Sequence, residues 1–353
     1  MNSFTADLAA ERMRRRQERI RRLRAERDER EAELVRRIPR LAELQAELAQ
    51  IGLAMARAVL RGPGSGVGGA DPADLARRGQ ALTAERDALL RAHGADPHDL
   101  EVWWDCPDCQ DTGWIRPQVA PGQESVAPPQ KCHCLIREEI EDLYRLSGLT
   151  PAMREHVFER FDLTVYPPED RDYMAWVREE CRRAAGAIAA GEAAPNLLLE
   201  GGVGLGKTFL AAAMANAVLA RGRLAVYFTF PEFLDVLRRA RFDEEALAAL
   251  VGRALEADLL VLDDLGAEKL SEFVAQELFN ILNRRVAAGR PLVIATNLDL
   301  RELRQYYGER IESRIVGHFE AIRLRGQDVR LVLKQRQLRA VREGRPGRGR
   351  EGA

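Results

Sequence analysis

Residues 201–208, GGVGLGKT, follow the apolar run LLL at 197–199 and lead into FLAA at 209–212. Two glycines followed by Lys-Thr at this spacing, between a strand and a helix, are typical of a phosphate-binding P-loop. Backbone N–H groups in such a loop converge on a bound anion, and the dipole of the following helix adds to the attraction. The stretch therefore predicts a parallel α/β core with a nucleotide site at its centre.

Each residue type in this loop has a chemical reason to be there. Lys207 is expected to reach the outer phosphates, and the Thr208 hydroxyl to ligate Mg²⁺. Elsewhere the chain uses arginine for nearly all its cations, so a lysine here indicates that a compact point charge is needed. A chance glycine-rich turn is disfavoured by the strand before the loop and the helix after it. The predicted ATP-binding residues are Gly201, Gly202, Val203, Gly204, Leu205, Gly206, Lys207, Thr208 and Phe209.

Length and composition predict several units in one chain. At 353 residues the chain exceeds the usual size of one domain, and its net charge of −1 points to no particular partner. We expect no membrane segment, because no apolar run approaches about 18–20 residues and the N-terminus lacks a signal-peptide core. A cytoplasmic location follows, with its cysteines reduced or metal-bound. The expected divisions are 1–95, 96–150, 151–333 and a disordered basic tail at 334–353.

The first division is predicted to be a helical docking arm. Apolar residues at three- and four-residue steps form one stripe on a charged rod over residues 1–61. Pro39 is expected to kink or split this helix, a glycine-rich hinge follows at 62–69, and Asp71-Pro72 starts another helix. A helical hairpin or a short coiled coil fits this pattern, as does a spacer without a partner. The Arg14-Arg15-Arg16 run could contact nucleic acid, although a solvated helix face is favoured.

The second division contains paired cysteines. Cys106 and Cys109 form C-x₂-C, and Cys132 and Cys134 form C-x-C. Four thiolates at this spacing can surround one zinc ion, and a unit of this size without a long apolar run needs such a metal to form a core. All-cysteine ligation is preferred, although His133 could replace one thiolate.

The third division alternates strand and helix, which predicts a parallel sheet covered on both faces. Strands are expected at 196–200, 224–229, 259–262, 292–296 and 319–324. The third strand, LLVL, runs into Asp263 and Asp264, the Walker B pattern. Asp263 is expected to hold Mg²⁺, and Asp264 to orient the attacking water. Many such ATPases carry Glu at this second position. Asn297, after the fourth strand, is placed to contact the γ-phosphate, or else caps its strand.

Three further segments make a family resemblance specific. They are DLLVLDDLGAEK at 258–269, TNL at 296–298 and YGERIESRI at 307–315. Together they resemble the bacterial replicative-helicase loaders of the DnaC/DnaI family, AAA+ ATPases of the initiator clade, and the cysteine quartet resembles the DnaI branch in particular. The similarity covers residues 106–332, whereas the arginine-rich rod matches only in position and helical character.

The resemblance implies a strand order of 5-1-4-3-2 and side-by-side self-association with ATP between subunits. It assigns Arg314 as the arginine that completes a neighbour's site, with Arg310 as the next candidate, and Arg330 as the sensor 2 arginine. With little chain after the fifth strand, the AAA+ lid is reduced or absent, which weakens the assignment of Arg330 more than that of Arg314. The segment at 238–255 corresponds to an insert that tracks single-stranded DNA, where phosphate contacts and one stacking ring come from Arg238, Arg239, Arg241 and Phe242. For Phe242, ordinary packing is an equal alternative.

The resulting hypothesis is a loader ATPase that uses ATP, Mg²⁺ and single-stranded DNA to deliver a hexameric replicative DNA helicase, held by its N-terminal units. One alternative is a transposition helper ATPase of the IstB type, against which the cysteines and the rod argue. The other is a zinc-containing adaptor that uses ATP as a structural ligand, which the aspartate at position 264 keeps open.

Overall fold

The structure is a computed structural model that describes residues 3–61, 71–115, 128–266, 268 and 270–343. Two compact units are present, one spanning Ala9–Leu135 and one built on the chain from Ile136 onward. Among the described residues, no helix has both the length and the apolar character needed to cross a membrane.

The unit of Ala9–Leu135 is mostly helical. Pro39 is the first residue of α2, because a proline tolerates the first helical position but interrupts the interior of a helix. The predicted split at Pro39 is therefore confirmed, and Asp71 caps α3 by accepting a hydrogen bond from the Ala73 N–H. The predicted hinge at 62–69 lies outside the described residues. The elements are α1 (Ser3–Arg37), α2 (Pro39–Arg61), α3 (Pro72–Ala92), the 3₁₀ turn η1 (Pro97–Leu100), β1 (Trp114–Ile115), β2 (Gln130–Lys131) and the start of α4 (His133–Ser147).

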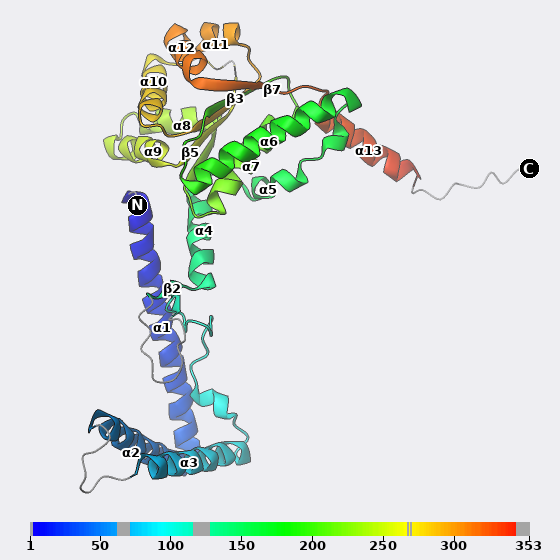
Figure 1. Cartoon of the computed structure of the whole chain (residues 1–353). Coiled ribbons are helices and arrows are strands. Elements are labelled where there is room, and N and C mark those ends of the chain that lie inside the picture. The colour runs from blue at the N-terminus through cyan, green and yellow to red at the C-terminus, as the bar shows by residue number, and fades with distance from the viewer. Residues whose placement is uncertain (1–2, 62–70, 116–127, 267, 269, 344–353) are drawn as a thin grey trace, which may run out of the picture. The chain divides into compact units, whose positions relative to one another are not determined.

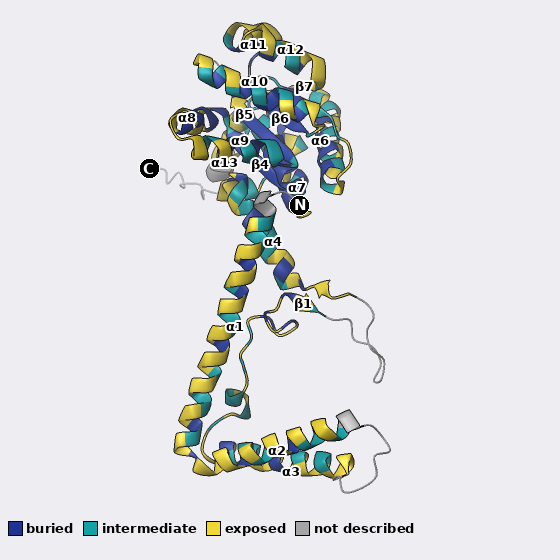
Figure 2. Ribbon diagram, turned by 90° about the vertical axis from the view of Figure 1, so that its left-hand side faces the viewer, coloured by how far each residue is buried: buried dark blue, intermediate teal, exposed yellow. Residues whose placement is uncertain are grey.

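Helices α2 and α3 form the predicted helical hairpin, as Figure 1 shows. Leu41 packs with Leu90, and Leu44 and Ile51 pack with Leu82. Each leucine or isoleucine buried in this way contributes roughly 1.5–3 kcal/mol. Figure 2 shows the outward faces of both helices as largely exposed.

The second unit contains the predicted parallel sheet. Its strands are β3 (Asn196–Glu200), β4 (Ala225–Thr229), β5 (Leu259–Leu265), β6 (Leu292–Thr296) and β7 (Phe319–Arg323). They lie in the order β4-β5-β6-β3-β7. Read from β7 and numbered 1 to 5 from β3 to β7, that order is 5-1-4-3-2, which confirms the predicted order. Figure 2 shows the central strands as buried, in keeping with their runs of leucine, valine and isoleucine.

Helices cover both faces of the sheet. The connection from β3 to β4 crosses the sheet in the opposite direction to the later connections, so right-handed crossovers place α7 on one face and the later helices on the other. Accordingly, α7 packs on α6 and on three strands, while α10 packs on α8, α9 and α12 (Figure 1). The helices are α5 (Pro151–Arg154), α6 (Pro168–Ala190), α7 (Lys207–Leu219), α8 (Phe230–Ala240), α9 (Glu244–Glu256), α10 (Glu272–Ala287), α11 (Leu300–Tyr307), α12 (Glu309–His318) and α13 (Val329–Glu343), with 3₁₀ turns η2 (Phe158–Arg160) and η3 (Leu163–Val165).

One boundary prediction is wrong. The disordered tail was expected from residue 334, but α13 continues to Glu343. Residues 334–343 are rich in arginine, glutamine, leucine and alanine, which are good helix formers, and Gly344 and Pro346 come only after them. The remainder of the predicted tail lies outside the described residues.

Candidate nucleotide site and cysteine cluster

The P-loop joins β3 to α7, and its glycines are required by close approaches. Gly206 has φ +93°, and a Cβ there would lie 2.8 Å from the Tyr166 hydroxyl. Gly204 has φ +77°, and a Cβ there would collide with the carboxylate of Asp328. Neither position tolerates a side chain, so the sequence pattern of the loop follows from its backbone and its neighbours.

Lys207 folds back onto the loop that it follows. Its Nζ donates hydrogen bonds to the carbonyl oxygens of Gly201 and Gly202, each at 2.7 Å. Burial lowers the pKa of Lys207, and the nearby carboxylates of Asp263 and Asp264 oppose that change. The lysine is therefore held inside the loop with the two Walker B acids close by.

Asp263, at the end of β5, is the buried acid of the site. It is 3% exposed, and its Oδ2 accepts a hydrogen bond of 2.5 Å from the Tyr227 hydroxyl on β4. Burial raises the pKa of Asp263, and hydrogen bonds from the side chains of Tyr227 and Thr208 partly offset this rise. Thr208 and Asp263, the two residues predicted to hold Mg²⁺, are thus close enough for the threonine side chain to lower the pKa of the acid. Sequence reasoning missed Tyr227, which looks like an ordinary apolar strand residue.

Asp264 differs from Asp263 in its backbone conformation and in its exposure. It has φ +56° and is exposed, and the register of β5 against β6 shifts between Leu262 and Leu265. Aspartate is several-fold enriched in this left-handed region, whereas most side chains avoid it. The bulge therefore turns the second acid outward, and it gives a physical reason for a short aspartate where longer glutamates are common.

The other strand ends bring their residues to the same edge of the sheet. In the parallel register, Glu200 on β3 lies opposite Thr296 on β6, and Thr229 on β4 lies opposite Asp263. Asn297 therefore leaves the sheet beside the start of the P-loop, where its side chain is exposed. The structure brings together the predicted lysine, threonine, acids and asparagine at one carboxyl edge.

The connector before the core contacts the P-loop directly. The Tyr166 hydroxyl donates to the Leu205 carbonyl at 2.8 Å, and the rings of His156 and Phe161 pack on Phe209. Asn216 of α7 anchors the connector by donating to the His156 carbonyl at 2.7 Å. The aromatic side chains of the connector thus border the loop.

Helix α13 begins at the same loop. The Val329 N–H donates to the Gly204 carbonyl at 2.9 Å, and the Asp328 carboxylate accepts from the Arg330 N–H. Arg330 is exposed and lies close enough to Lys207 to lower the pKa of that lysine further. The predicted sensor 2 arginine is therefore at the site, and Asp328 is a neighbour that sequence reasoning missed.

Arg314 has its contacts elsewhere. From α12, its guanidinium lies 6.0 Å from the ring centre of Phe279 on α10 and 3.4 Å from the Nε2 atom of His318. Arg310 lies over the same ring at 4.5 Å. Both candidates for the shared-site arginine are thus presented on one aromatic ring of α10.

The last turn of α8 and the residues that follow it carry the predicted DNA-contacting residues. Arg238, Arg239 and Arg241 are exposed, and Phe242 is 88% exposed. The Arg241 guanidinium lies 5.5 Å from the ring centres of both Phe242 and Phe273. The alternative that Phe242 packs in the core is therefore wrong, because its ring faces solvent beside the basic C-terminal end of α8.

The cysteine pairs converge in the unit of Ala9–Leu135. The Sγ atoms of Cys106, Cys109, Cys132 and Cys134 all lie within 4.8 Å of one another, and the Cys109–Cys134 and Cys106–Cys132 distances are 3.4 and 3.7 Å. Tetrahedral zinc–thiolate bonds of about 2.3 Å place sulfurs about 3.8 Å apart, so the cluster fits a zinc ion. A second grouping uses Asp108 and His133 beside Cys106 and Cys132, but its two non-cysteine residues are exposed.

Taken together, a P-loop after the first strand, paired acids after the third and a sheet of this order define a P-loop ATPase of the AAA+ type. Residues 182–338 match the family model described as IstB-like ATP binding protein. The chain thus contains an IstB-like ATP-binding domain and is homologous to the DnaC and DnaI helicase loaders, as its resemblance predicted.

The individual relatives are distant. The replicative helicase loader DnaC of Escherichia coli (strain K12) is 26% identical over 214 residues, which cover 57% of this chain and 83% of DnaC. The replicative helicase loader DnaI of Bacillus subtilis (strain 168) is 28% identical over 141 residues, 38% of this chain and 45% of DnaI. A crystal structure of the DnaC helicase loader, 21% identical, aligns with a TM-score of 0.42 over 50% of this chain and all of that chain.

Proposed function

We propose that this protein is an ATP-dependent loader of a hexameric replicative DNA helicase. The observation that carries the proposal is the assembly of Lys207, Thr208, Asp263, Asp264 and Asn297 at one sheet edge, in a chain homologous to two helicase loaders. We propose that the helical residues 1–95 and the cysteine unit 96–150 bind the helicase, and that residues 151–333 bind and hydrolyse ATP.

Each residue of the site has a separate role in ATP hydrolysis. Lys207 exchanges its carbonyl partners at Gly201 and Gly202 for phosphate oxygens, which are better acceptors for a cation. Thr208 and Asp263 would hold Mg²⁺, which would neutralise phosphate charge. The exposed Asp264 orients the attacking water, and Asn297 contacts the γ-phosphate.

Two arginines extend the site. Arg314 contacts Phe279 rather than its own P-loop. We therefore infer that it acts in the ATP site of a neighbouring subunit, which requires self-association. Arg330 acts in its own subunit, since it already lies close to Lys207. Loss of the γ-phosphate then removes a charge that bridges two subunits, and the assembled state dissociates.

Single-stranded DNA is the second proposed ligand. An exposed ring beside Arg238, Arg239 and Arg241 offers a base-stacking surface with phosphate contacts and no means of reading sequence. We place the DNA contact at this end of α8.

We propose that the cysteine cluster binds a zinc ion. The all-cysteine set is favoured because three of its four residues are buried, whereas Asp108 and His133 are exposed. The metal would join β1 and β2 to the start of α4 and so replace the hydrophobic core that this short segment lacks.

A co-purification experiment with an ATPase assay tests the proposal. The full-length protein should bind the replicative helicase of its own organism in the presence of ATP, and single-stranded DNA should stimulate its ATPase. Lys207→Ala should abolish hydrolysis while leaving the fold intact. Failure to bind that helicase, together with an ATPase indifferent to DNA, would contradict the proposal.

A transposition helper is the second candidate, and the IstB-like family match favours it. That function predicts ATP-dependent binding to double-stranded DNA and capture of a transposase. The same co-purification, read for a transposase in place of a helicase, separates the two. A Lys207→Ala protein that kept full function would instead support an adaptor that uses ATP as a structural ligand.

A further inference from the structure

Arg16 of α1 lies inside the cysteine unit. Its side chain is 1% exposed, although it ends a run of three arginines that favours a solvated helix face. Its Nη2 donates to the Cys134 sulfur at 3.4 Å, and its Nη1 donates to the Asp111 carbonyl at 2.9 Å. A long-range contact of this kind, 118 residues apart for Cys134, joins the N-terminal helix to the C-x-C pair.

The loop between the cysteines is shaped around this guanidinium. Gly113 has φ +83°, and a Cβ there would lie 3.2 Å from the Arg16 Nη1. The Gly113 N–H donates to the Cys109 sulfur at 3.3 Å, so the glycine that makes room for the arginine also contacts the cluster. Asp111 is 1% exposed and accepts from the Cys106 N–H at 3.2 Å.

Two more arginines of α1 hold the same segment. Arg19 lies 3.5 Å from the Asp105 carboxylate and 3.8 Å from that of Asp111. Arg30 donates to the Glu101 carbonyl at 2.8 Å and stacks over the Trp103 ring at 3.8 Å. One helix therefore contacts the cysteine-bearing loop at several points, and Arg16 reaches a cysteine sulfur itself.

The charge of a four-thiolate zinc centre explains why an arginine would be buried here. Four thiolates around a divalent zinc ion carry a net charge of −2, and a buried charge of that size needs a counter-charge. We propose that Arg16 stabilises the four-thiolate zinc centre and thereby couples metal binding to the docking of α1. Metal binding then strengthens the hold on α1, and the docked helix in turn strengthens metal binding, since such coupling is reciprocal. This inference rests on the zinc centre proposed above.

Zinc affinity and helix protection test the coupling in the full-length protein. Competition with a chromophoric zinc chelator measures affinity, and amide hydrogen exchange over residues 9–30 measures the docking of α1. Arg16→Gln should weaken zinc binding about 10- to 100-fold, the usual effect of removing a residue that contacts a metal ligand. It should also raise exchange in α1 with zinc present, and chelation should raise it in the wild-type protein.

Matched variants make the result decisive. Arg24→Gln removes an exposed arginine of the same helix and should change neither measurement. Arg16→Lys keeps the charge and should retain most of the affinity, and it supplies the comparison if Arg16→Gln fails to fold. Wild-type zinc affinity in Arg16→Gln and Arg16→Lys alike, with α1 exchange indifferent to chelation, would overturn the inference. Absence of zinc binding by the wild-type protein would instead overturn the zinc centre itself.

Discussion

The Tyr227 hydroxyl donates a hydrogen bond of 2.5 Å to Oδ2 of Asp263, and both side chains are buried. The two residues lie on neighbouring strands, β4 at one edge of the sheet and β5 beside it. This hydrogen bond occupies one oxygen of the Walker B carboxylate and so restricts its orientation.

Tyr227→Phe tests this positioning. Removing the hydroxyl leaves a buried carboxylate with one partner fewer, a loss of about 1–3 kcal/mol. We expect the Mg²⁺ concentration needed for half-maximal ATPase to rise about tenfold, with a smaller change in ATP affinity. Tyr173→Phe, which removes a hydroxyl bonded to the exposed Arg323 carbonyl, is the control and should leave the Mg²⁺ dependence unchanged. Equal Mg²⁺ titrations for all three proteins would contradict the role of Tyr227.

The pH dependence of ATPase activity should follow the same carboxylate. Burial raises the pKa of Asp263, and the Tyr227 hydrogen bond opposes that rise. Because the ionised form holds Mg²⁺, activity should fall as pH decreases through this raised pKa. In Tyr227→Phe the opposing hydrogen bond is lost, so the acidic limb of the profile should move to higher pH. Profiles at saturating ATP measure the shift, and a limb that stays in place would show that another group controls it.

Asp264 should resist replacement by the glutamate common in related sites. Its φ of +56° costs most side chains about 1–2 kcal/mol, and aspartate and asparagine less. We expect Asp264→Glu to lower stability by about 1 kcal/mol without raising the hydrolysis rate, whereas Asp264→Asn should keep stability and lose hydrolysis. Thermal unfolding and single-turnover hydrolysis check the pair. A glutamate variant that is both stable and faster would show that the bulge does not determine the residue.

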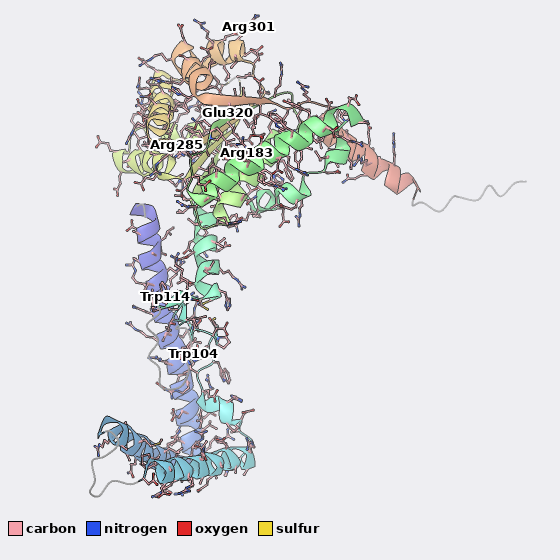
Figure 3. All side chains as sticks on the ribbon, in the orientation of Figure 1. Trp104, Trp114, Arg183, Arg285, Arg301 and Glu320 are labelled. Atoms are coloured by element: carbon pink, nitrogen blue, oxygen red, sulfur yellow. The ribbon has the colours of Figure 1, made fainter. Side chains whose placement is uncertain are left out.

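Arg285 of α10, labelled in Figure 3, is predicted to stabilise the folded protein. Its guanidinium is buried and donates to the carbonyls of Ala254, Ala257 and Pro291 at 2.7, 2.9 and 2.6 Å. Burial lowers the pKa of Arg285 to about 9, so its charge is retained near neutral pH. Arg285→Met removes a donor from each of these carbonyls, although the Leu260 N–H still donates to that of Pro291, and should destabilise the protein by about 3 kcal/mol.

The neighbouring Arg284 provides the comparison for that measurement. Arg284→Met removes an exposed arginine from the same helix and should change stability by less than about 0.5 kcal/mol. Chemical denaturation of the two variants decides the prediction, and equal midpoints would contradict it. Since the Arg285 contacts hold the end of α9, the variant should also disturb the DNA-contacting segment that precedes this helix.

These residues show which features a sequence reveals and which it hides. The P-loop and the strands were predictable because glycine spacing and strand–helix alternation are local patterns, whereas the strand order came from the family resemblance. Asp263 and Asp264 are adjacent, as are Arg284 and Arg285, yet one member of each pair is buried and the other exposed. That difference depends on a bulge in β5 and on carbonyls about thirty residues away, and neither can be recognised from the local amino-acid sequence. The Arg14-Arg15-Arg16 run misled for the same reason, because the partner of Arg16 is a distant cysteine.

Arg314 allows a test of whether the ATP site is shared between subunits. Phe279 holds its guanidinium on α10, and we expect Arg314→Ala to reduce ATPase activity about 10³-fold, as loss of an arginine finger does. Lys207→Ala should be inactive as well. Mixed together, the two variants should regain a measurable part of the activity, because an intact P-loop from one protein can meet an intact Arg314 from the other. If Arg314 acted only within its own chain, no mixture would recover. Arg310→Ala, which removes the other arginine on the Phe279 ring, shows whether recovery is specific to Arg314.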